Sequence, residues 1–173
     1  ATALTRLSEI SSAINYEQPL DHSLLTIATA VQEATPFQIT LISVYEPETG
    51  LLQRVAGVGM PPEKMVELLS HKQPLASIKQ LLRPEFKIGR AYFIPADQTP
   101  VIPADMHTVI SLHSATGAKS SNTWDPEDFL LIPLEDAQDQ PVGLLSLDAP
   151  RDNLRHDRAT LETLEIFAAQ AAL

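Results

Sequence analysis

Hydrophobic side chains recur along this chain with two different periods, and stretches rich in proline, glycine and aspartate separate them. Spacings of three and four residues, typical of an amphipathic helix, run through Leu4, Leu7, Ile10 and Ile14. Together with proline and aspartate start signals, such spacings predict five helices. They cover residues 2–17, 21–35, 61–70, 75–82, and from His156 or Asp157 to the end of the chain.

Alternating or continuous runs of branched and aromatic residues predict strands between these helices. The strands cover residues 37–45, 51–57, 88–95, 129–135 and 142–148. The turn Glu46–Gly50 joins the first two strands into a hairpin, and Asp136–Pro141 joins the last two. Residues 96–128 are irregular, with at most a short edge strand from Val109 to His113.

This order of elements predicts one α+β domain spanning residues 1–173. Hairpins impose antiparallel pairing, so we expect a central antiparallel sheet of five to six strands. The terminal helices are expected on one face of the sheet, and the short helices with the long loop on the other. A small ligand would then lie between the sheet and the long loop. The last helix carries no stop signal, which predicts a module cut from a longer multidomain protein.

Composition narrows the possible functions. The net charge is −10, and the 12 basic residues are scattered, which argues against a nucleic-acid surface. The chain has no cysteine, so disulfides, thiolate metal sites and cysteine nucleophiles are excluded. No apolar run approaches the roughly 18 residues that a membrane-spanning helix needs. A cytoplasmic location with no membrane contact is therefore expected.

Four segments, taken in order, resemble a known family. They are the hairpin Tyr45–Gly50, the strand Gly89–Pro95 with Asp97 behind it, Trp124 followed by Asp128–Leu134, and Gly143–Pro150 before the last helix. In this order they are similar to the GAF domains of bacterial signalling proteins, and the resemblance covers nearly all of the chain.

The resemblance implies a GAF/PAS-like fold with a small-molecule pocket on the sheet face away from the terminal helices. It also implies dimerisation through the first and last helices, and a fused output such as the histidine kinase of a two-component system or a diguanylate cyclase. The function that follows is a small-molecule-sensing regulatory domain. A structural dimerisation and signal-relay module that binds no ligand is the alternative.

Branches of the family can be compared with single residues. Covalent bilin attachment and methionine-sulfoxide reduction both need cysteines, which this chain lacks. The signature of the cyclic-nucleotide-binding branch, Asn-Lys followed by Phe and Asp-Glu, does not occur. The cofactor therefore stays unknown, with non-covalent haem or bilin among the possibilities. The acidic pairs Glu127/Asp128 and Glu135/Asp136 fall at strand ends, where solvated carboxylates are common, so no enzymatic activity is expected.

Seven residues are candidates for ligand binding: Arg90, Tyr92, Asp97, His113, Trp124, Ser146 and Asp148. Arg90 and Tyr92 share one side of the strand 88–95, where they would bind an anionic or aromatic ligand, unless Arg90 is a solvated strand residue. Asp97 either accepts a hydrogen bond from a ligand or caps its own loop.

The remaining candidates also have structural interpretations. His113, with His107, faces either the ligand or solvent, and the pair lacks the spacing of a metal site. Trp124 either stacks on a ligand or anchors the loop on the core. Ser146 and Asp148 alternate with leucines, so they form either the rim of a pocket or a wet sheet face.

Apolar residues on the terminal helices exceed what one packing face needs, which predicts a homodimer built from these helices. The candidate interface residues are Leu4, Leu7, Ile14, Leu161, Leu164, Ala168 and Ala171.

Overall fold

The computed structural model describes residues 20–98 and 122–173. The helix expected at residues 2–17 and the edge strand expected at 109–113 lie outside these residues. His107 and His113 also lie outside the described residues, and His113 is one of the seven candidate ligand residues.

The described residues form one antiparallel sheet of seven strands in the order β3-β2-β1-β7-β6-β5-β4. The long strands are β1 (Phe37–Glu46), β2 (Leu51–Val58), β6 (Phe129–Glu135) and β7 (Pro141–Pro150), and the short ones are β3 (Lys72–Pro74), β4 (Lys87–Ile88) and β5 (Ala91–Ile94). The long strands match the two expected hairpins, and β1 pairs with β7 at the centre of the sheet.

Seven strands replace the expected five to six because both edge strands are too short to carry an alternating pattern. β3 has three residues and β4 has two. The single strand expected at 88–95 is divided by a turn at Gly89, whose φ of +62° favours glycine.

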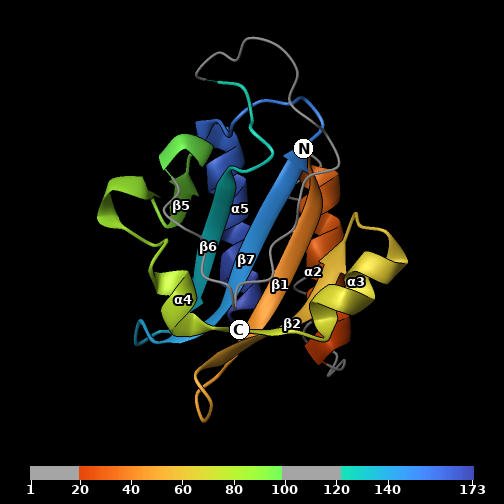
Figure 1. The fold of residues 1–173 in the computed structure, drawn as a ribbon, viewed down its shortest axis with the longest axis vertical. Coiled ribbons are helices and arrows are strands. Elements are labelled where there is room, and N and C mark those ends of the chain that lie inside the picture. The colour runs from red at the N-terminus through yellow and green to blue at the C-terminus, as the bar shows by residue number, and fades with distance from the viewer. Residues whose placement is uncertain (1–19, 99–121) are drawn as a thin grey trace.

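Helices cover both faces of the sheet. In Figure 1, α2 (Leu20–Ala34) and α5 (Arg158–Ala171) lie behind the sheet, and α3 (Pro62–Leu69) and α4 (Leu75–Lys79) lie in front of it. Two single-turn 3₁₀ helices, η1 (Pro84–Phe86) and η2 (Ala96–Gln98), flank β4 and β5. The sheet therefore separates two layers, as the element order predicts for the part of the chain that the structure describes.

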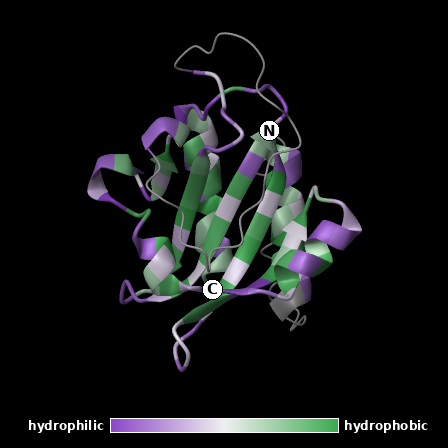
Figure 2. Cartoon of the chain, viewed as in Figure 1, coloured by the Kyte–Doolittle hydropathy of each residue, from purple (hydrophilic) through white to green (hydrophobic). Residues whose placement is uncertain are grey.

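The main core lies between the sheet and the pair α2 and α5. Its largest side chains include Phe37 on β1, Trp124, and Phe167 on α5, none more than 2% exposed. Figure 2 shows hydrophobic residues, in green, recurring along the strands of the sheet. Two smaller apolar clusters lie on the opposite face, one against α3 and one against α4.

The last helix begins where the sequence predicts. Asp157 is its N-cap, and the Asp157 side chain accepts a hydrogen bond of 2.7 Å from the backbone N–H of Thr160. Because this bond favours the charged carboxylate, the pKa of Asp157 is lowered.

Candidate functional site

Polar side chains gather on the sheet face that α3 and α4 cover, which we call the distal face. Ser43 on β1 stands opposite Arg54 on β2 and opposite Leu144 on β7. Residues directly opposite one another in an antiparallel pair lie on the same face. Leu144 packs in the same cluster as Ile78 of α4, so all three positions belong to the distal face.

Arg54 is a buried charged residue of this face, with only 5% of its surface exposed. Its Nη1 donates a long hydrogen bond of 3.5 Å to the carbonyl oxygen of Leu68 at the end of α3. Burial lowers the pKa of the guanidinium from its ordinary value to about 10, because a charged group loses hydration there. The group is still protonated at neutral pH, so it brings a positive charge beneath α3. Sequence reasoning missed Arg54, since a strand arginine looks the same in sequence whether it is solvated or buried.

Ser146 and Asp148 of β7 extend the polar positions of the distal face. Ser146, which is half-buried, stands opposite Leu41 of β1 and Leu131 of β6. Asp148 stands opposite Ile39, which packs with Leu41 in the cluster against α3. Ser146 therefore faces the α3 and α4 layer, as the pocket-rim interpretation requires. The strand register places Asp148 on the same side, but the Asp148 side chain bonds to Trp124, which belongs to the main core.

Asp148 is buried at the end of the sheet, where its carboxylate is held by two donors. Its Oδ1 accepts hydrogen bonds from the backbone N–H of Ala149 at 2.7 Å and from Nε1 of Trp124 at 3.2 Å. Burial nevertheless raises the pKa of Asp148 to about 6, and the charge of Asp128 adds to the rise, while the two hydrogen bonds oppose it. This carboxyl therefore titrates close to physiological pH.

Trp124 belongs to the main core. It is 2% exposed, and its ring lies 5.6 Å from Phe37 in an edge-on arrangement and 6.0 Å from Phe93. Its indole N–H, the one polar atom of the side chain, is used by Asp148. In this position Trp124 anchors the residues before β6 on the core.

The other described candidates do not converge on one place. Tyr92 is half-buried on the distal face, opposite Leu131. The expectation that Arg90 shares the face of Tyr92 on one strand is wrong, because Arg90 lies in the exposed turn before β5. Its backbone N–H donates to Oε1 of Glu165 on α5, on the other side of the sheet, at 2.7 Å. Asp97 is exposed in η2.

Asp128 is a central residue that sequence reasoning took for a solvated carboxylate. That interpretation holds for the exposed Glu127, but the Asp128 side chain has no exposed surface. Its oxygens accept backbone N–H bonds from Ala96 and Asp125, both 2.8 Å, and bind Nε and Nη2 of Arg155 at 3.1 and 3.3 Å. One carboxylate thereby joins the end of β5, the start of β6 and the segment before α5. The Asp125/Asp128 spacing suggests a local turn, but nothing in the sequence links Asp128 to Arg155.

A cleft of about 260 Å³ lies next to this junction, near the start of α5. Phe37, Pro150, Arg155 and His156 are among its lining residues, and the six candidate ligand residues that the structure describes are not. Burial and the neighbouring Arg155 charge lower the pKa of His156, so its ring favours the neutral form. The cleft is therefore separate from the polar group of the distal face.

The distal-face side chains offer hydrogen-bond donors to a ligand. Arg54 supplies a positive charge with several N–H donors, and Ser43 and Ser146 supply hydroxyl groups. Among residues 20–98 and 122–173, no three His, Asp or Glu side chains gather as a metal site would need. None of the helices described there is long and apolar enough to cross a bilayer.

Comparison with known proteins shows which protein family the sequence matches. Residues 19–173 match the sequence model of the GAF domain. No curated protein matches the chain in sequence.

Several solved structures share the fold across most of their length. The GAF domain of an Acinetobacter phosphoenolpyruvate-protein phosphotransferase is 16% identical, with a TM-score of 0.66 over 98% of this chain and 89% of its own. Residues 122 to 287 of a methyl-accepting chemotaxis protein are 18% identical, with a TM-score of 0.67 and coverages of 97% and 94%. The phycoerythrobilin-bound GAF domain of a cyanobacterial phytochrome is also 18% identical, with a TM-score of 0.64 and coverages of 99% and 93%. At such identities the likeness shows the fold alone.

Proposed function

The chain belongs to the GAF domain family, and on that basis we propose that it is a small-molecule-sensing regulatory domain of a bacterial signal-transduction protein. The similar domains from a chemotaxis protein and a phytochrome support a signalling role. The proposal includes a cytoplasmic location and a fused output such as a histidine kinase of a two-component system.

The observation that carries the ligand-binding proposal is the buried guanidinium of Arg54 on the distal face. This guanidinium lies opposite Ser43 among the polar side chains of the distal face, and its N–H groups can donate to two oxygens of one anion, so the position suits a site where an anion binds. The ligand we propose is a small molecule with a carboxylate or phosphate group, bound by Arg54 in a bidentate manner. Of the candidate residues, Tyr92 and Ser146 lie on the distal face, and we propose that they complete this site.

Signal transfer would use the connections between the sheet and α5. The Glu165 carboxylate holds the backbone of Arg90, so movement of the β4–β5 turn is passed to α5. The dimer that we propose joins the first and last helices. Of its candidate residues on α5, Leu161, Leu164 and Ala168 pack in the main core, so the contact would use the outer side of α5, where Ile166 is 43% exposed. Ligand binding would then shift the helices of the dimer relative to one another.

Native mass spectrometry of gently purified protein tests whether a ligand is retained. A non-covalent mass that disappears on denaturation supports sensing, and an absorption spectrum of the same sample identifies haem or bilin. Light scattering during size exclusion tests the dimer, and a monomer at tens of micromolar would contradict it.

A thermal-shift screen then tests the role of Arg54. We expect hits among carboxylate- and phosphate-bearing metabolites and none among their neutral analogues. At 100 times its Kd a ligand adds about 2.7 kcal/mol of stability. Arg54→Met should abolish the shift, while Arg158→Met, at a site where 93% of the side chain is exposed, should keep it.

Arg54→Met removes the charge and keeps an unbranched side chain, and far-UV circular dichroism checks that this variant is folded. A screen without hits, together with no retained mass, would favour the signal-relay module that binds no ligand. Hits that persist in Arg54→Met would refute the anion site but not the sensing function.

A further inference from the structure

Positive charge is concentrated in one segment of this acidic chain. Residues 72–90 hold five of the 12 basic residues, and Glu85 is the one carboxylate among them. The basic residues are therefore unevenly distributed along the chain. The segment runs through β3, α4, η1 and β4, from one edge of the sheet to the other.

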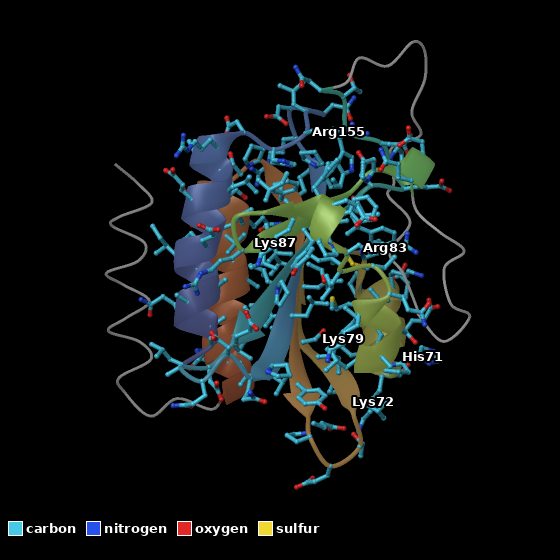
Figure 3. All side chains as sticks on the ribbon, turned by 90° about the vertical axis from the view of Figure 1, so that its left-hand side faces the viewer. His71, Lys72, Lys79, Arg83, Lys87 and Arg155 are labelled. Atoms are coloured by element: carbon cyan, nitrogen blue, oxygen red, sulfur yellow. The ribbon has the colours of Figure 1, made fainter. Side chains whose placement is uncertain are left out.

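Four of these cations form what we call the basic strip: Lys72, Lys79, Arg83 and Lys87. All four are exposed. Figure 3 shows them on one side of the molecule, from Lys72 near its foot to Lys87 at mid-height, with Arg155 well above them. The fold thus presents the strip as an outer surface of the layer that crosses the distal face.

Much of the charge of the basic strip is not neutralised by the described residues. Lys72 binds Glu46 at 3.0 Å, and Arg83 lies 4.0 Å from the exposed Glu85. Within residues 20–98 and 122–173, Lys79 and Lys87 have no carboxylate at ion-pair distance. At least two cations are therefore available to a partner without breaking an existing pair.

Protection of a sheet edge explains only part of the strip. A lysine on a short edge strand discourages unwanted strand pairing, and Lys87 on β4 fits that role. Lys79 and Arg83 belong to α4 and the residues after it, so they guard no edge. Ile88, 41% exposed beside Lys87, adds an apolar contact of the kind found in protein interfaces.

The nature of the strip favours a polypeptide over other polyanions. Lys79, Arg83 and Lys87 are spaced four residues apart, and the one aromatic residue among them, Phe86, is buried and unavailable for stacking on bases. A nucleic acid or an anionic bilayer would also extend over the rest of a chain whose net charge is −10. A short acidic segment can contact the strip alone.

We propose that the basic strip is a docking surface for an acidic polypeptide segment, whose carboxylates pair with Lys79, Arg83 and Lys87 beside Ile88. The surface is distinct from the distal-face site around Arg54. Docking would place the partner against the layer that covers that face.

The test uses fluorescein-labelled poly-L-glutamate of about 20 residues as the probe, with binding measured by anisotropy at 50 mM NaCl. The patch variant is Lys79→Glu/Lys87→Glu. The matched control is Lys64→Glu/Arg158→Glu, which changes the net charge equally at exposed ion pairs outside the strip. Far-UV circular dichroism confirms that both variants are folded.

We expect the wild-type protein to bind the probe, with affinity falling as salt screens the exposed charges. The patch variant should bind roughly tenfold more weakly, and the control within about threefold of the wild type. No binding by the wild type, or equal weakening in both variants, would overturn the proposal. So would tighter binding of a single-stranded 20-mer oligonucleotide or of phosphatidylserine vesicles than of poly-L-glutamate.

Discussion

Replacing Asp148 by asparagine should change how the stability of the domain depends on pH. Asp148 is 8% exposed, and burial raises its pKa from 3.8 to about 6. The folded state therefore takes up this proton at a higher pH than the unfolded chain. The contribution of Asp148 to the free energy of unfolding must fall as pH rises from about 4 to above 6.

The size of the effect follows from the shift of roughly two pKa units, each worth about 1.4 kcal/mol. Most of the interval between the unfolded-state pKa of 3.8 and the folded-state pKa of about 6 lies between pH 4.5 and 7.5. About 2 kcal/mol of the free energy of unfolding should therefore be lost over that pH range in the wild type. An asparagine can accept the same bonds from Trp124 and Ala149 without ionising. Relative to the wild type, Asp148→Asn should thus gain about 2 kcal/mol on going from pH 4.5 to 7.5.

The assay is urea unfolding at several pH values, followed by circular dichroism and by the fluorescence of Trp124, the sole tryptophan. His156 has a lowered pKa and so destabilises the folded state in acid, but this cancels in the difference between variant and wild type. Asp152→Asn, at an exposed position, is the matched control and should give a constant difference. A constant difference for Asp148→Asn as well, or one of opposite slope, would refute the reasoning.

Three further substitutions test the packing and the buried carboxylate by urea unfolding at pH 7. Gly59→Ala should cost more than about 2 kcal/mol, because its φ is +90° and a Cβ would clash with the backbone oxygen of Gln38. Gly50→Ala, with φ of +74° and open space around it, should cost only about 1 kcal/mol, and equal costs would show that the close approach does not matter. Asp128→Ala should cost roughly 3–5 kcal/mol, since it removes the acceptor that binds the Arg155 guanidinium and two backbone N–H groups. Glu162→Ala in an exposed pair should cost less than about 1 kcal/mol, and similar values for the two would contradict the buried junction. Phe167→Ala should cost roughly 3–5 kcal/mol if its fully buried ring fills the main core, and a loss below about 1 kcal/mol would argue against that packing.

Local patterns were enough to predict most of the fold. The long strands carry alternation or continuous apolar runs, and proline, glycine and aspartate mark their turns, so the hairpins β1–β2 and β6–β7 could be read directly. The start of α5 was readable too, because Asp157 precedes a helical pattern and caps it. The edge strands β3 and β4 could not be predicted in this way, because two or three residues are too few to show a hydrophobic period.

The sequence by itself determined the α+β class, the central hairpins, the absence of cysteine chemistry and the membership of the GAF domain family. Only the tertiary structure decided which polar residues are buried. Arg54, Asp128 and Asp148 look like ordinary surface residues in the sequence, and their partners lie 14, 27 and 24 positions away. The physical reason is that burial and pairing are long-range properties, set by how strands from different parts of the chain meet in one sheet. The basic strip has the same origin, because a crossing segment turns spaced lysines and an arginine into one exposed surface.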